Sequence, residues 1–98
     1  MKIDLKKEES KLFISLEGKL DTNTSPELDK TITELEGINE LYIDLKNVDY
    51  ISSAGLRVLL SMQKIMNKQG KMVIKNVCEN VMDIFEVTGF SEILNIEA

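Results

Sequence analysis

Two adjacent serines, in the segment Ser52-Ser53-Ala54-Gly55-Leu56, are the residues of this chain whose type and position suggest chemistry. An apolar helical pattern follows them, so their hydroxyls fall at the expected start of a helix. Free backbone N–H groups and the helix dipole favour negative charge there, which suits helix capping, anion binding or phosphorylation. The segment is neither a Walker loop, which needs a lysine, nor the glycine-flanked serine turn of hydrolases.

The absence of histidine limits what these serines can do alone. The 98 residues include no histidine, no tryptophan and one cysteine, Cys78. A Ser-His-Asp or Cys-His triad therefore cannot form within the chain, and zinc sets built from Cys and His are excluded. A single cysteine also cannot form an internal disulfide. We predict no catalytic residue, no metal and no cofactor, and hence that the protein is not an enzyme.

Charge and length narrow the possible partners. The net charge is −5, from 17 acidic and 12 basic residues, which argues against direct binding of nucleic acid. No apolar run approaches the ~20 residues of a membrane span, and the first residues lack the apolar stretch of a signal peptide. We expect one domain over residues 1–98, in the cytoplasm and without contact with a membrane.

Alternating apolar and polar residues predict the strands that position the serines. The expected strands lie near residues 3–5, 12–16, 41–45 and 72–74, and Ile93, Leu94 and Ile96 could form a short last one. A polar link near Ser10 predicts a hairpin between the first two strands. A turn is expected from Asn47 to Tyr50.

Helices are expected between the later strands. Ser25 is predicted to cap the first, with Pro26 in its first turn and an apolar stripe reaching Leu35. The second is expected from Ser53 to about Lys68. In the third helix, Asn76 and Glu79 form a predicted capping pair, an apolar stripe runs from residue 77 to 85, and Gly89 ends the helix.

The predicted order of elements is β-β-α-β-α-β-α-β. The opening hairpin gives an antiparallel pair, and each later helix connects parallel strands. The first three strands alternate, so one face of the sheet should be open to water. We predict an α/β fold: a small mixed sheet of four to five strands with helices packed mainly on one face.

The predicted second helix is apolar over more than one face. Its Leu, Val, Met and Ile residues cover roughly 220° of the surface, although one sheet face requires only ~100° or a little more. Neighbouring helices could cover the excess, or it could be an exposed strip that receives a partner.

Three segments resemble the STAS domain of bacterial anti-sigma factor antagonists. They are Gly18-Lys19-Leu20-Asp21, the run from Ile43 to Leu60 that contains both serines, and Phe85-Glu86-Val87-Thr88-Gly89-Phe90. The resemblance implies that an anti-sigma factor serine kinase phosphorylates Ser53. It also implies that the unphosphorylated form captures this kinase and frees a sigma factor, and that a PP2C-type phosphatase resets it. Well-known antagonists have Asp where this chain has Ser52, so Ser52 is a rival acceptor.

The resemblance also places the loop after the second strand beside the serine turn. The expected partner-binding or anion-binding residues are Asp21, Thr22, Asn23, Ser52, Ala54, Gly55, Leu56 and Arg57. The loop residues could instead form only a polar connection between strand and helix. Alternative functions are a module that binds a small ligand or nucleotide at the same helix start, or a scaffolding subunit, in both cases without covalent switching.

Overall fold

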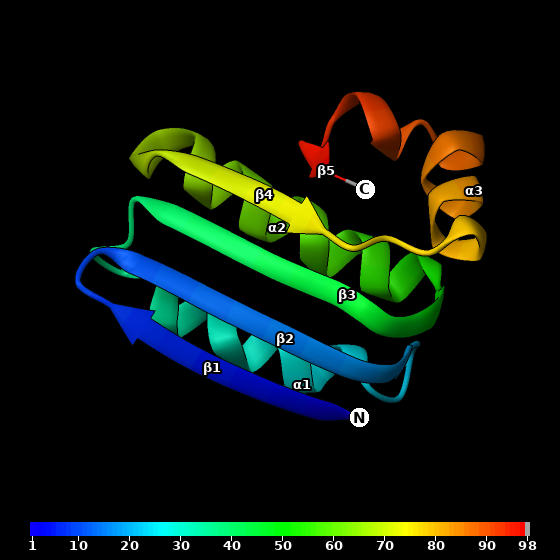
Figure 1. Cartoon of the computed structure of the whole chain (residues 1–98), viewed down its shortest axis with the longest axis horizontal. Coiled ribbons are helices and arrows are strands. Elements are labelled where there is room, and N and C mark those ends of the chain that lie inside the picture. Colours follow the sequence, from blue (N-terminus) through cyan, green and yellow to red (C-terminus); the bar gives the residue numbers. More distant parts are fainter. Residues whose placement is uncertain (98) are drawn as a thin grey trace.

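A computed structural model describes residues 1–97, which form one five-stranded sheet and the helices packed around it (Figure 1). The strands are β1 (Lys2–Glu8), β2 (Lys11–Leu20), β3 (Glu40–Ile51), β4 (Lys71–Lys75) and β5 (Ile96–Glu97). Their order in the sheet is β1-β2-β3-β4-β5, with β1 antiparallel to β2 and all other neighbours parallel. The predicted mixed α/β sheet is confirmed.

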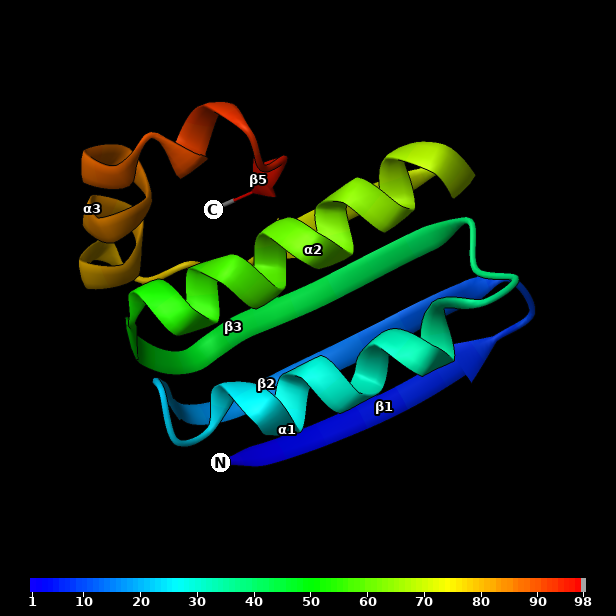
Figure 2. The same cartoon turned by 180° about the vertical axis from the view of Figure 1, so that it is seen from behind.

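The helices lie mainly on one face of this sheet, as predicted. They are α1 (Ser25–Asp29), α2 (Ser53–Gln69) and α3 (Glu79–Thr88), with 3-10 segments η1 (Lys30–Leu35) and η2 (Phe90–Glu92). Seen from behind, α1 and α2 run side by side across the same face (Figure 2). By contrast, α3 lies beyond the ends of β3 and β4 (Figures 1 and 2). The opposite face of the sheet is left open.

The hydrophobic core lies between the sheet and this helical layer. From α2, Leu59, Met62 and Met66 are fully buried, and Val58 and Ile65 are half-buried against the core. Across residues 1–97, the large hydrophobic side chains that remain exposed are Leu5, Tyr50, Val87 and Ile93, and none belongs to α2. The wide apolar surface of α2 is therefore covered by its neighbours and is not an exposed strip.

The predicted turn at residues 47–50 is wrong, because β3 continues to Ile51. The end of β2 pairs with this stretch, and the register shifts between Ser15 and Glu17 and again between Gly18 and Leu20. These irregularities change the side-chain period, so Leu45, Val48 and Ile51 are buried at every third position. The end of this strand could not be predicted from the sequence because its apolar and polar residues do not strictly alternate.

The start of the first helix also differs from the prediction. Thr24, and not Ser25, is the residue before α1, and no side chain caps the helix. The Ser25 hydroxyl instead donates backward to the carbonyl of Asp21. Pro26 lies in the first turn as expected, but the helix changes to 3-10 geometry at Lys30.

Two predictions near the C-terminal end are wrong as well. Cys78 precedes α3 without a capping side chain, so Asn76 and Glu79 form no capping pair. Asn76 has a φ of 58°, a left-handed conformation that Asn tolerates, and its amide donates to Asp44 at 3.2 Å. The last strand begins only at Ile96, and the Leu94 side chain packs into the core from the preceding loop. Gly89, with φ 81°, ends α3 as predicted.

Candidate functional site

The two serines have different roles at the start of α2. Ser52 is the residue before the helix, and its hydroxyl accepts the N–H of Gly55 at 3.4 Å. Ser53 is the first residue of the helix, and its side chain is exposed. Ser52 is half-buried and acts as the cap, so Ser53 is the better placed of the two to meet another molecule.

A close packing contact fixes this helix start against the ends of β2 and β3. The backbone N–H of Ser52 donates to the carbonyl of Leu20 at 2.9 Å. Gly55 lies so close that a Cβ there would be 2.7 Å from Leu20 Cγ, 2.9 Å from Leu20 O and 3.0 Å from Ile51 Cγ2. Only glycine fits this approach without movement of its neighbours. The turn that carries Ser53 is therefore held in one position.

The loop after β2 is ordered by its own hydrogen bonds. Asp21 Oδ1 accepts the N–H groups of Asn23 at 2.9 Å and of Thr24 at 3.0 Å. The Thr24 hydroxyl donates to the carbonyl of Lys19 at 2.6 Å. The N–H of Thr24 above all, and then the N–H of Asn23, hold the pKa of Asp21 below its ordinary value of 3.8. Asp21 thus shapes the loop, whereas Thr22 and Asn23 are exposed.

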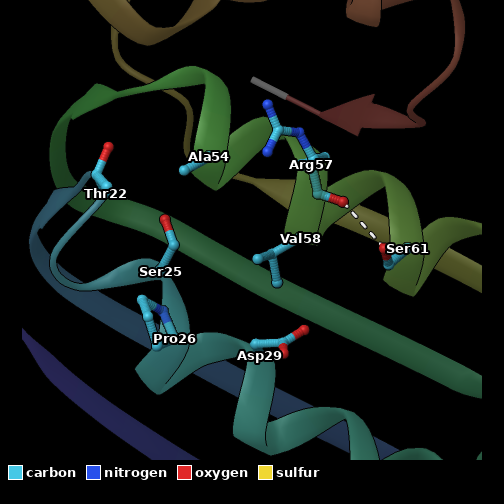
Figure 3. Close-up of a pocket in the computed structure, with 8 residues that line it drawn as sticks. All are labelled: Thr22, Ser25, Pro26, Asp29, Ala54, Arg57, Val58 and Ser61. Carbon is cyan, nitrogen blue, oxygen red and sulfur yellow. Dashed lines mark hydrogen bonds between the residues drawn. The ribbon is translucent and has the colours of Figure 1, made fainter.

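A groove of about 290 Å³ runs between α1 and α2, beside the serine turn (Figure 3). It is lined by Thr22, Ser25, Pro26, Asp29, Ala54, Arg57, Val58 and Ser61. Val58 points across the groove toward α1 (Figure 3). Pockets for drug-sized ligands usually measure about 300–1,000 Å³ and enclose most of the ligand. This groove is better suited to a few side chains of a protein partner.

The site is locally favourable to negative charge, although the protein as a whole is acidic. The first turn of α2 contains no acidic residue, so no charge within that turn offsets the positive end of the helix dipole, although Asp29 of α1 lines the same groove. Arg57 follows Ser53 by four residues and therefore lies on the same side of the helix. Within residues 1–97, Arg57 forms no salt bridge. Its guanidinium can therefore meet an anion.

The structure brings together some of the predicted residues and places others below the surface. Thr22, Ala54 and Arg57 all line the groove, and Ser53 adjoins it. Gly55 and Leu56 are buried, Leu56 to 5% exposure, so they can support the site but cannot contact a partner.

Sequence reasoning missed the contribution of α1. The α1 residues Ser25, Pro26 and Asp29 form one wall of the groove. This wall depends on how two helices pack, so no local pattern in the sequence could have indicated it. Tyr50, two residues before Ser52, is 45% exposed but does not line the groove.

Two other kinds of site are absent from residues 1–97. No three or more Cys, Asp or Glu side chains gather there in a way that could hold a metal ion. Over the same residues, no helix has the length and apolar character needed to cross a membrane.

Sequence comparison gives a family and named relatives. The model of the STAS domain matches residues 2–98. An anti-sigma-B factor antagonist of Bacillus subtilis is 32% identical over 98 residues, which cover 98% of this chain and 90% of the relative. One from Staphylococcus aureus is 30% identical over 86 residues, covering 85% and 80%.

Structure comparison finds the same fold in solved proteins. An anti-sigma factor antagonist from Mycobacterium paratuberculosis has a TM-score of 0.86 at 20% identity, covering 97% of this chain and 83% of that one. The antagonist SpoIIAA in its unphosphorylated form has a TM-score of 0.73 at 14% identity, covering 99% and 88%. SpoIIAA of Bacillus in its phosphorylated form has a TM-score of 0.68 at 14% identity, covering 99% and 92%.

Proposed function

The chain belongs to the STAS domain family, and we propose that it is an anti-sigma factor antagonist whose binding is switched off by phosphorylation of Ser53. In its unmodified form it binds an anti-sigma factor that is also a serine kinase, and a sigma factor is thereby released in the bacterial cytoplasm. The relatives in Bacillus and Staphylococcus are named anti-sigma-B factor antagonists, which supports the antagonist part of the proposal. The observation that carries the proposal is the exposed Ser53 at a fixed helix start, beside a groove.

The chemistry of the switch is supplied by other proteins. Ser53 Oγ attacks the γ-phosphorus of ATP held by the kinase, the bond to the β–γ bridging oxygen breaks, and ADP leaves. The hydroxyl proton passes to a base of the kinase, because this chain has no histidine to accept it. A PP2C-type phosphatase then directs water onto the phosphorus, which restores the serine and releases inorganic phosphate. The antagonist itself acts as substrate and binding partner.

Phosphate on Ser53 changes the surface more than the fold. It adds about −1.5 to −2 charges at pH 7. The end of the helix dipole favours that charge, and Arg57 lies one turn away on the same side. Unmodified, Arg57 is available to an acidic group of the partner; modified, it is neutralised by the phosphate. Bulk and repulsion against partner acids complete the loss of binding.

The test of this proposal combines phosphorylation and binding. The protein is incubated with ATP and each purified anti-sigma factor kinase of the source bacterium, and its intact mass is measured. We expect one phosphoryl group on wild type and on Ser52→Ala, and none on Ser53→Ala. Modification of Ser53→Ala but not of Ser52→Ala would assign the switch to Ser52. No modification with any of these kinases, together with direct binding of ATP by the chain alone, would favour a nucleotide-binding module.

Binding measured by calorimetry completes the test. We expect Ser53→Ala to bind the kinase as tightly as wild type and Ser53→Asp to bind at least about tenfold more weakly. Arg57→Ala should also weaken binding, whereas Lys64→Ala should not. Lys64 is the matched control, since it is exposed and lies two turns further along the same side of α2. Equal binding by Ser53→Asp and wild type would contradict the switch.

A further inference from the structure

Among residues 1–97, β1 is the longer of the two strands at the edges of the sheet, and its outer side is unpaired. It has seven residues, of which all but Ile3 are exposed, and only one of its sides is bonded, to β2. In the part of the chain that the structure describes, β5 at the opposite edge has only two residues. Figure 1 shows β1 along the free border of the sheet. Such an edge presents unpaired N–H and C=O groups to another strand.

The open face of β1 carries charges that alternate in sign. Lys2, Asp4, Lys6 and Glu8 lie opposite Glu17, Ser15, Phe13 and Lys11 of β2, and so share the face without helices. Their order is plus, minus, plus, minus. Reversed in direction, the same order reads minus, plus, minus, plus. An antiparallel copy of this strand is therefore complementary to the original in the register that overlaps all four charged residues; shifts by two steps oppose unlike charges again but over fewer pairs.

We propose that β1 pairs with β1 of a second copy of this chain, antiparallel and with Leu5 on the twofold axis. Lys2 then lies opposite Glu8 of the other copy, and Asp4 lies opposite Lys6, each twice by symmetry. The two sheets join into one of ten strands. The Lys6–Glu8 salt bridge of the single chain, 3.2 Å long between exposed groups, is easily exchanged for these contacts.

The neighbouring registers are unfavourable, which makes the proposed one specific. Backbone geometry allows the copy to slide only in steps that keep the bonding groups facing each other. One step in one direction places Lys2 against Lys6 and Asp4 against itself. One step in the other places Asp4 against Glu8 and Lys6 against itself. Like charges directly opposite each other destabilise a strand pair.

The other face of β1 supplies apolar contact at the same axis. Leu5 pairs with the buried Ile14 of β2, so it lies on the helical face, yet 44% of it is exposed. In the proposed register the two Leu5 side chains meet, and Ile3 meets the aliphatic stem of Lys7. Pairing thus covers one of the four large hydrophobic side chains that remain exposed in residues 1–97.

The test is analytical ultracentrifugation of wild type, Asp4→Lys and Lys6→Asp at concentrations up to about 1 mM. Wild type should form a dimer. Each substitution replaces two attractive pairs with two repulsive ones, so its dissociation constant should rise at least about tenfold. A mixture of the two variants restores opposite charges at every position, and should dimerise like wild type. Asp83→Lys, exposed on α3, controls for the change in net charge.

Disulfide formation then checks the register. In a Cys78→Ser background, cysteine at position 5 lies opposite itself, within the ~4.4–6.8 Å between Cα atoms that a disulfide requires. Cysteine at position 7 lies about 14 Å from its copy. We expect Leu5→Cys to oxidise to a dimer and Lys7→Cys to remain a monomer. A monomeric wild type, a dimer insensitive to both charge variants, or equal oxidation at positions 5 and 7 would overturn the proposal.

Discussion

Substitution of Gly55 by alanine tests whether the start of α2 is as closely packed as the structure indicates. In an open helix this change stabilises by about 1 kcal/mol, because glycine loses more backbone freedom on folding. Here the new methyl would lie 2.7 Å from Leu20 Cγ and 2.9 Å from Leu20 O. The side chain of Leu20 is fully buried in the core and has little room to turn away, and its carbonyl is held by the N–H of Ser52 at 2.9 Å.

The expected result is a net loss of stability. Overpacking of this kind costs about 1–3 kcal/mol, and contact with a fixed backbone oxygen places Gly55→Ala in the upper half of that range. Against the gain of about 1 kcal/mol in helix propensity, we expect a net loss of about 1–2 kcal/mol. For a chain of this size that lowers the melting temperature by about 5–15 °C.

Urea unfolding and thermal melts followed by circular dichroism measure this difference. Ser61→Ala is the control, since Ser61 is exposed on the same helix and alanine adds no atom there. Its stability should stay within about 0.5 kcal/mol of wild type. If Gly55→Ala proved more stable than wild type by the ordinary helix increment, the close contact with Leu20 would not exist in solution.

Two further predictions concern charge near the same turn. Ser53→Asp should raise the free energy of unfolding by about 0.3–1 kcal/mol at low salt, because it places a negative charge at the positive end of the α2 dipole, and added salt should remove this gain. The control is Ser53→Asn, compared by urea unfolding. If Ser53→Asp were less stable than Ser53→Asn, the fold would not tolerate a phosphate at this position. Asp21→Asn should be less stable than wild type near neutral pH. Because folding lowers the pKa of Asp21, its contribution is present above 3.8 and is lost as the pH falls through the folded value. The difference between Asp21→Asn and wild type in urea midpoints should therefore shrink below pH 3.8, and a constant difference would assign the loss to shape alone.

Regular patterns in the sequence predicted much of the fold. Leu12, Ile14 and Leu16 alternate without interruption, and they form the central part of β2 with all three side chains buried. Gly89 was predicted to end a helix and does so in the left-handed conformation that glycine favours. Such patterns involve only neighbouring residues, so the elements they specify can be predicted without knowledge of the rest of the molecule.

Features that depend on distant contacts were missed. The stretch from Asn47 to Tyr50 is polar and rich in turn-forming residues, yet pairing with the end of β2 makes it a strand. The prediction for Ser25 failed for a local reason: its hydroxyl donates to the carbonyl of Asp21, four residues earlier, and does not cap the helix. The serine turn is a local pattern and could be located from the sequence, whereas the wall of the groove formed by α1 depends on the packing of two helices and could not.

The tight attachment of Ser53's turn to β2 also determines how long a signal can last. The hydrogen bond to Leu20 and the close packing at Gly55 hold this segment in a single arrangement in the structure. In the proposed switch, the off state is then stored in a covalent phosphate ester and not in a shape. Because such esters hydrolyse extremely slowly in water, the memory would persist until an enzyme erased it. The phosphatase would accordingly set the duration of the response, and no conformational relaxation of the antagonist would limit it.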